Sequence, residues 1–268
     1  MIRYGLLTKF HEIAHFCTSR EGGVSVGNYA SFNLSPFSGD NPEDFNKNKQ
    51  ILCDQIGIEP DKLIIPFQTH GTEIREIDET FFQLSASTKV GFLNGVDALI
   101  TRITSVCIGV TTADCVPLTF FDPVQQVIAV AHAGWRGTCA RIAEKTVHAM
   151  IEKYNSAPSY ILVGIGPSIS VHVYEVGKEL VECFDTAGFE TEQIFKTRNH
   201  SIFLDLWKAN QLSLEKAGIL PENIEVAGIC TFTEHERFFS ARRLGIKSGR
   251  MLSGIMLAPN LNKLEPKG

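Results

Sequence analysis

Two neighbouring segments of strand-forming residues, 116–121 and 127–131, most constrain how this chain can fold. Both are apolar, β-branched or aromatic runs of strand length, and the link between them begins with Asp122 and Pro123. Asp followed by Pro favours a type I turn, because the Asp side chain caps the turn backbone and Pro presets its own φ. The two segments therefore predict an antiparallel β-hairpin.

This hairpin would bring two metal-binding side chains together. If Asp122 and Gln125 face each other, Cys115 lies opposite His132, with Cβ atoms about 5 Å apart, and a longer turn would shift this register by one. The best candidate for a third ligand is His70, which follows a strand-like run and precedes a glycine. Two His and one Cys leave the fourth position of a tetrahedral Zn²⁺ open, as in catalytic sites. A buried thiol and two hydrogen-bonded histidines would fit these residues equally well.

Composition limits the class of protein. The 268 residues are 44% hydrophobic and 21% charged, which is typical of an ordinary globular chain, and we expect one domain over residues 1–268. The net charge of −5 gives no basic face, so we expect neither nucleic acid nor membrane as a partner. Seven cysteines without a Cys-x-x-Cys pair, and no secretory leader, favour a cytoplasmic protein with free thiols.

The pattern of apolar residues predicts a mixture of helices and strands. We expect helices over residues 46–56, about 138–154, 174–184 and 205–217. Strands are expected over residues 96–101, 106–112, 160–165 and 224–232, and residues 251–257 are expected to end the fold. Hairpins where a parallel fold would need helical crossovers favour an α+β class with mixed β-sheets.

The string HEIAH at residues 11–15 matches the His-Glu-x-x-His pattern of zinc peptidases. That pattern binds zinc only on a helix, where both histidines share one face. Apolar residues at helical spacing give local support. However, the string runs directly into Arg20-Glu-Gly-Gly and has no evident third ligand, so we regard a peptidase as the weaker interpretation.

Other polar residues are candidates for substrate contacts or catalysis. Arg136 lies between two glycines before an expected helix, where free N–H groups and a guanidinium favour an anion such as phosphate. Asp114, next to Cys115, is a candidate acceptor or proton carrier near the metal, although strand alternation would point it to the opposite face. Asn33 lies in a loop where its amide could contact ribose or base, or simply form a turn.

Four strings together resemble the YfiH-like family, whose members are labelled polyphenol oxidase, multi-copper laccase or purine nucleoside phosphorylase. The strings are QTHG (68–71), ADCVP (113–117), HAGWRG (132–137) and SARRLG (240–245). The resemblance extends over about residues 13–257. It implies a layered α-β-β-α sandwich, His70, Cys115 and His132 as metal ligands, and Arg242 and Arg243 as substrate contacts. Ala241 departs from the pattern, because many members have an aromatic residue there.

The resemblance also implies a function: zinc-dependent phosphorolysis of adenosine, inosine and S-methyl-5′-thioadenosine, with deamination of adenosine as a further activity. The expected partners are purine nucleosides and phosphate, and the expected cofactor is one Zn²⁺. Copper is an alternative, because a His₂Cys set also suits it. A true laccase needs several coppers and many histidines, whereas this chain has eight histidines and no His-x-His pair. A non-catalytic metal-binding protein is the third possibility.

Overall fold

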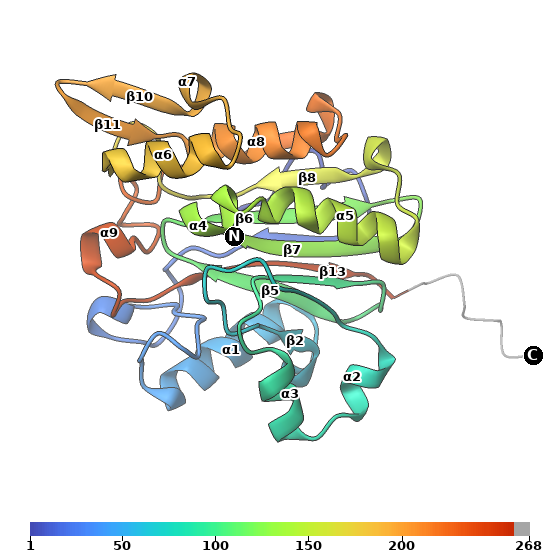
Figure 1. Cartoon of the computed structure of the whole chain (residues 1–268). Coiled ribbons are helices and arrows are strands. Elements are labelled where there is room, and N and C mark those ends of the chain that lie inside the picture. Colours follow the sequence, from blue (N-terminus) through green and yellow to red (C-terminus); the bar gives the residue numbers. More distant parts are fainter. Residues whose placement is uncertain (260–268) are drawn as a thin grey trace, which may run out of the picture.

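The structure is a computed structural model that describes residues 1–259, and two stacked β-sheets between helices form its core. Figure 1 shows helices α6 (Lys178–Thr186) and α8 (Leu206–Lys216) above the sheets and α1 (Pro42–Ile56) below them. The end of the domain predicted from the sequence, residues 260–268, lies outside the described residues.

The first sheet has the strand order β1-β13-β5-β2. Its strands are β1 (Ile13–Cys17), β2 (Leu63–Ile64), β5 (Cys107–Thr112) and β13 (Met251–Leu257). Leu52 of α1 packs against one face of this sheet, in a buried cluster with Phe16 and Leu252. The α1 helix ends, as predicted, at Gly57, whose φ of 70° is readily available only to glycine.

The second sheet has the order β12-β8-β6-β7-β4-β3 and mixes parallel and antiparallel pairs. Its strands are β3 (Ile74–Glu76), β4 (Ala98–Thr101), β6 (Val116–Asp122), β7 (Val127–Ala133), β8 (Leu162–Ile165) and β12 (Ile224–Val226). On its inner face, Phe121 and Val130 share a buried cluster with Ile108 and Ile255 of the first sheet. On its outer face it packs against α5 (Ile142–Tyr154), α6 and α8.

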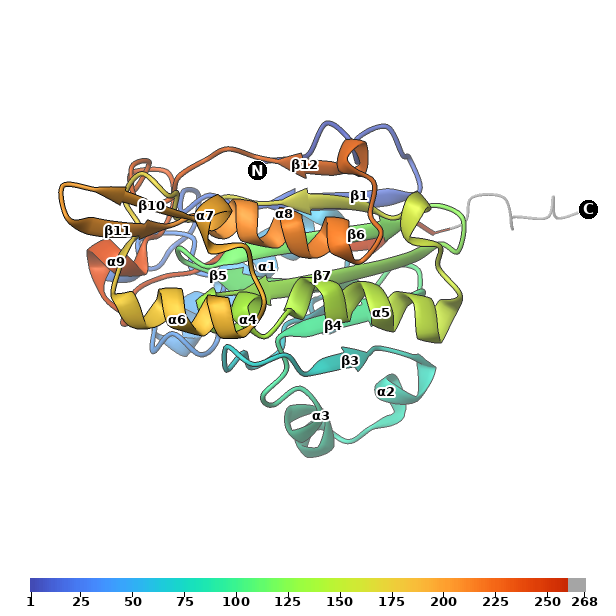
Figure 2. The ribbon, with the colours of Figure 1, turned by 45° about the horizontal axis from the view of Figure 1, so that its top comes forward.

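Shorter elements complete the described chain. They are α2 (Glu79–Gln83), α3 (Ala86–Phe92), α4 (Trp135–Cys139), α7 (Thr191–Ile194), α9 (Ala241–Leu244), β9 (Glu175–Val176), β10 (Phe195–Arg198) and β11 (Ser201–Leu204), with 3₁₀ turns at Gly27–Tyr29, Pro60–Lys62, Pro158–Tyr160 and Pro221–Asn223. The strands β10, β11 and β9 form a small sheet of their own. Figures 1 and 2 show β10 and β11 projecting at the end of the molecule where α9 lies.

These layers confirm the predicted α+β class and the α-β-β-α sandwich with mixed sheets. The order is α1, the first sheet, the second sheet, and then α5, α6 and α8. Within residues 1–259, none of the helices combines the length and apolar character needed to cross a membrane.

The predicted hairpin is present, but its predicted register was wrong. Asp122 pairs with Val127, and Pro117, not Cys115, lies opposite His132. The loop therefore spans residues 123–126 and is longer than expected. Gln126, its last residue, takes a left-handed φ of 52°. The shift amounts to two residues on one strand, and an even shift keeps a side chain on the same face of the sheet. Cys115 therefore remains a diagonal neighbour of His132.

Two elements are shorter than the sequence predicted. The expected helix over 174–184 begins only at Lys178, because Glu175 and Val176 pair with β11 as strand β9. The expected strand over 224–232 ends at Val226, two residues before Gly228 with its φ of 67°. Neither the partner strand β11 nor the glycine conformation is visible in a local apolar pattern.

The His-Glu-x-x-His string lies on a strand rather than a helix, which excludes the peptidase interpretation. His15 belongs to β1 and is 4% exposed. Its Nε2 accepts a hydrogen bond of 2.9 Å from the backbone N–H of Tyr4, and its ring stacks on the Tyr4 ring. His11 precedes the strand. The two histidines therefore do not share a helical face.

Candidate metal centre

The site lies where β6 begins and β7 ends. His132 is the penultimate residue of β7, and Cys115 lies in the bend just before β6. Gly134, which follows β7, leaves room for the thiol: a Cβ at this position would lie 3.0 Å from Cys115 Sγ and 3.0 Å from His70 Cδ2. Glycine at position 134 thus lets the backbone approach both side chains closely.

His70 reaches the same place from a loop after β2. Its φ of 63° is in the left-handed region, which is rare for a residue with a Cβ. The backbone N–H groups of Thr69, His70 and Gly71 all donate to the Asp97 carboxylate, at 3.1, 3.0 and 2.7 Å. The side-chain amide of Gln68, the residue before Thr69, donates a hydrogen bond to the backbone oxygen of Thr111 and accepts one from the Thr111 backbone N–H. These bonds hold the loop in its strained conformation.

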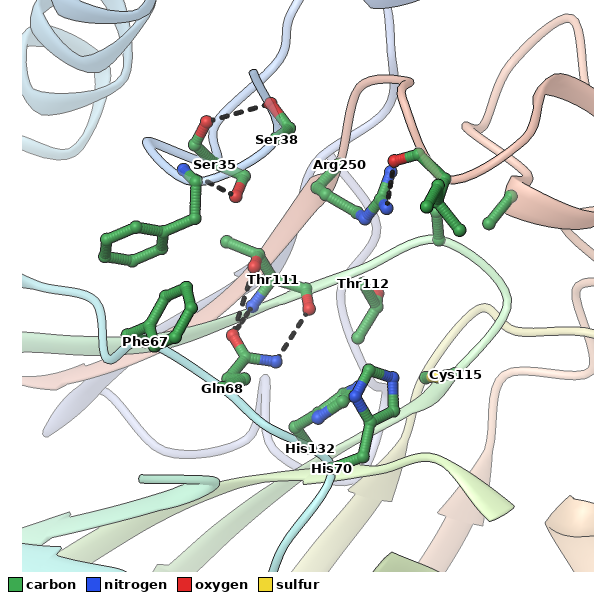
Figure 3. A pocket seen from close by; sticks show the side chains of 14 residues that line it. Ser35, Ser38, Phe67, Gln68, His70, Thr111, Thr112, Cys115, His132 and Arg250 are labelled. Atoms are coloured by element: carbon green, nitrogen blue, oxygen red, sulfur yellow. Dashed lines mark hydrogen bonds between the residues drawn. The ribbon is translucent and has the colours of Figure 1, made fainter. Parts of the chain in front are cut away.

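The structure brings together the three residues predicted as ligands. One possible ligand atom from each of His70, Cys115 and His132 lies within 4.8 Å of the others. The two imidazole centroids are 4.8 Å apart at an interplanar angle of 72°, and Figure 3 shows both rings beside Cys115. Within residues 1–259, this is the group of His, Cys and acidic side chains that has the geometry to hold a metal ion.

Asp97 orients one of these three predicted ligands. Its fully buried carboxylate accepts a 2.7 Å hydrogen bond from Nδ1 of His132, which leaves Nε2 of this ring free. A carboxylate behind a histidine is the usual support of a metal-bound imidazole. Sequence reasoning missed Asp97. An acid inside the apolar run 96–101 was a usable signal, because buried acids nearly always have a partner.

The charges of the three side chains depend on one another. Burial alone would raise the pKa of the Cys115 thiol, but the adjacent His132 and His70 lower this pKa to about 6. Burial opposes the charged form of His132, yet Cys115 and Asp97 raise the pKa of its imidazole to about 9. The site thus favours a thiolate at Cys115, the form in which cysteine binds metals. The donor set and its supports fit one Zn²⁺ with an open fourth position.

A pocket of about 260 Å³ opens onto these three side chains (Figure 3). Two exposed rings, Phe37 and Phe67, meet edge to face with centroids 4.8 Å apart on its wall. The other lining residues are Ser35, Ser38, Gln68, Thr111, Thr112, Ala113, Ala241, Ile246 and Arg250. The pocket therefore combines an aromatic wall, several hydroxyl groups and one cation beside the metal-type cluster.

The structure places Asp114 and Asn33 in the protein framework beside this pocket. The Asp114 carboxylate accepts hydrogen bonds from Thr231 Oγ1, Ser240 Oγ and the backbone N–H of Arg242, so both of its oxygens have protein donors. The Asn33 side chain is fully buried. Its Oδ1 accepts from the backbone N–H groups of Ser35 and Arg250, and its Nδ2 donates to oxygens of Ser35, Ser38 and Asp40.

The three candidate arginines are exposed and do not line the pocket. The Arg136 guanidinium lies 4.3 Å from the centroid of the Trp135 ring. Arg242 donates to the backbone oxygen of Glu175, and Arg243 donates to that of Phe232. From the basic segment after residue 236, it is Arg250 that reaches the pocket wall.

Comparison with known proteins identifies the family. Residues 14–258 match the family described as multi-copper polyphenol oxidoreductase laccase. A purine nucleoside phosphorylase of Bacteroides thetaiotaomicron is 43% identical over 261 residues, which cover 96% of each chain. Adenosine deaminase RL5, from an unknown prokaryotic organism, is 41% identical over 90% of this chain and 92% of its own.

A solved structure agrees with these sequence matches. The crystal structure of Bacillus licheniformis hypothetical protein YfiH has a TM-score of 0.86 to this chain at 30% sequence identity, covering 91% of this chain and 92% of its own. The chain therefore belongs to the YfiH-like family, which confirms the resemblance inferred from its four sequence strings.

Proposed function

We propose that this protein is a zinc-dependent purine nucleoside phosphorylase that acts on adenosine, inosine and S-methyl-5′-thioadenosine and also deaminates adenosine. The observation that carries the proposal is the cluster of His70, Cys115 and His132 at the wall of a pocket. Relatives that match over nearly the full chain are named purine nucleoside phosphorylase and adenosine deaminase, which supports an enzyme of nucleoside chemistry.

Each residue of the site has a distinct role in this proposal. His70, Cys115 and His132 hold the metal, and Asp97 keeps His132 in the tautomer that leaves Nε2 free. When bound, Zn²⁺ supplies a Lewis acid that can activate water for deamination or stabilise negative charge on a departing purine. The aromatic wall of Phe37 and Phe67 gives the flat base an apolar surface.

Asp114 acts in this proposal by positioning. Its carboxylate ties Ser240 and the backbone of Arg242 to the bend that precedes Cys115. Asn33 also acts by positioning, because its side chain accepts a hydrogen bond from the Ser35 N–H and donates one to Ser38 Oγ in the loop that lines the pocket. The exposed Arg136, Arg242 and Arg243 are then left to contact the parts of a nucleoside that project from the pocket.

Copper-dependent oxidation of phenols is the second candidate, and the family description favours it. A His₂Cys set suits copper as well as zinc. A multi-copper mechanism, however, needs several metal sites, and residues 1–259 contain one group of three ligating side chains. We therefore prefer phosphorolysis to phenol oxidation as the function of this protein.

The test uses protein purified without added metal and analysed for its metal content. Adenosine is incubated with and without phosphate, and adenine, inosine and hypoxanthine are separated by chromatography. Release of adenine only with phosphate supports phosphorolysis, and inosine without phosphate marks deamination. If neither product forms, while copper-loaded protein consumes oxygen with a phenol, the oxidase replaces our proposal.

A further inference from the structure

Arg250 is the cation on the wall of the reaction pocket. It lies directly before β13 and lines the same pocket as His70, Cys115 and His132. Its guanidinium is fixed by the backbone: Nη1 donates to the oxygens of Ser248 and Gly249 at 2.8 and 3.0 Å, and Nη2 donates to that of Ile246 at 2.9 Å. The position of the charge is therefore set before any ligand binds.

This charge has no carboxylate partner. Among the ion pairs of residues 1–259, none includes Arg250. The bonds of Nη1 and Nη2 are to neutral oxygens, and within the described chain the Nε–H group makes no hydrogen bond. A partly buried guanidinium without an acid is costly unless an anion compensates it. Cys115 and Asp114 lie close enough to interact electrostatically with this charge, but neither makes a hydrogen bond or an ion pair with it within the described residues. The free Nε–H donor and the unpaired guanidinium thus suit a ligand with acceptor oxygens.

Thr112 gives independent evidence for a ligand at the same wall. Its side chain lines the pocket and is 1% exposed, yet its buried Oγ1 has no hydrogen-bond partner among the described residues. Buried hydroxyls without partners are uncommon in native proteins. In the view of Figure 3, Thr112 lies between Arg250 and the two imidazole rings. The hydroxyls of Ser35 and Ser38 line the pocket as well.

We propose that Arg250 and Thr112 form the subsite for inorganic phosphate in this pocket, with Ser35 and Ser38 at its edge. The inference rests on the proposed phosphorolysis, and it assigns inorganic phosphate, the second substrate, to the wall of the pocket that Arg250 and Thr112 form. There a phosphate oxygen donates an electron pair to C1′ of the nucleoside, and the C1′–N9 bond breaks. Its electron pair goes to the purine, which takes the proton of hydrogen phosphate, and ribose 1-phosphate is the second product.

The sequence predicts Arg136 as the residue that binds phosphate. In the structure this guanidinium is exposed, is stacked on Trp135 and does not line the pocket. Arg250 is preferred because it combines a fixed position, a free donor and a neighbouring hydroxyl without a partner.

The experiment measures the KM for phosphate in adenosine phosphorolysis, using the metal-loaded enzyme and two variants. Arg250→Met should raise this KM about 10- to 100-fold, the range for a lost hydrogen bond to a charged group. Thr112→Val keeps the shape of the side chain and should raise the KM about 3- to 10-fold. Lys247→Met is the matched control: it removes one positive charge from the same loop, is exposed outside the pocket, and should leave the KM unchanged.

Two further readouts separate the possible failures. Phosphate-independent deamination of adenosine should persist in Lys247→Met, and the zinc content of Arg250→Met and Thr112→Val shows whether their metal centre is intact. Calorimetric titration with inorganic phosphate alone tests the subsite even if the wild type shows no phosphorolysis, an outcome that would count against the proposed function. An unchanged phosphate KM in both variants, or equal phosphate affinity of the wild type and both variants, would overturn the inference.

Discussion

The carboxylate of Asp97 links the two histidines of the metal-type cluster. It accepts a 2.7 Å hydrogen bond from Nδ1 of His132 and a 3.0 Å hydrogen bond from the backbone N–H of His70. The same buried group therefore orients one imidazole and holds the strained loop that carries the other. Any change at Asp97 should therefore act on the proposed metal site through both histidines.

We expect Asp97→Asn to weaken zinc binding about 10- to 100-fold, the range for loss of a group that supports a metal ligand. The amide has nearly the same shape, but its NH₂ group cannot accept the hydrogen bonds that the backbone N–H groups of the His70 loop donate to the carboxylate. Competition with a chromophoric chelator measures the affinity. Equal affinity of the variant and the wild type would show that Asp97 only stabilises the fold.

The close approach of Gly134 gives a second prediction. Gly134→Ala should lower zinc affinity, because the new Cβ would lie 3.0 Å from both Cys115 Sγ and His70 Cδ2 and would push these side chains apart. Gly91→Ala is the control: this glycine lies in α3, and a Cβ there would meet no atom within 4 Å. The same chelator assay serves both variants, and an equal effect of the two substitutions would contradict the account.

His15 should make the protein less stable in acid. Burial and the nearby Arg3 charge lower the pKa of His15 from 6.5 to about 4. Between these values the unfolded chain takes up a proton that the folded chain does not. The contribution of neutral His15 is therefore complete above pH 6.5 and falls by about 3 kcal/mol as the pH decreases to 4.

The test compares urea unfolding of the wild type and His15→Gln from pH 7 to pH 4. Gln can still accept the hydrogen bond from the Tyr4 N–H, but it does not titrate. The wild type should lose more stability than the variant over this interval. Parallel loss in the two proteins would mean that His15 does not titrate as inferred.

Asn33 should be essential to the loop of the pocket. In Asn33→Asp, an acceptor would replace the Nδ2 donor that now lies 2.9 Å from Asp40 Oδ2, and two carboxylates would face each other in a partly buried place. We expect a loss of about 3 kcal/mol in the free energy of unfolding. The exposed Asn46 provides the control Asn46→Asp, and unfolding in denaturant measures both.

Sequence patterns predicted the parts of the fold that depend on local chemistry. The hairpin segments 116–121 and 127–131 became β6 and β7, and the helix over 205–217 became α8 with Asp205 as its cap. The register of the hairpin was not predictable in this way. It depends on Gln126 taking a positive φ, and the residue type gives no strong signal for that conformation.

The same limit applies to the site. His70, Cys115 and His132 stand out because imidazole and thiolate are metal-binding groups. Asp97 acquires its role only when β4 pairs with β7, and Arg250 only when β13 lies beside β5. Both pairings join residues far apart in the sequence. A local pattern could mark Asp97 as an unusual acid in an apolar run, but it could not show the partner of either residue.

The most direct test of the central claim measures phosphate-dependent adenine release and bound zinc in the same preparations of the wild type and Cys115→Ala. The account predicts about one zinc per chain and adenine release in the wild type, and the loss of both in the variant. Unchanged phosphorolysis by a zinc-free Cys115→Ala protein would contradict the claim that this cluster carries the reaction.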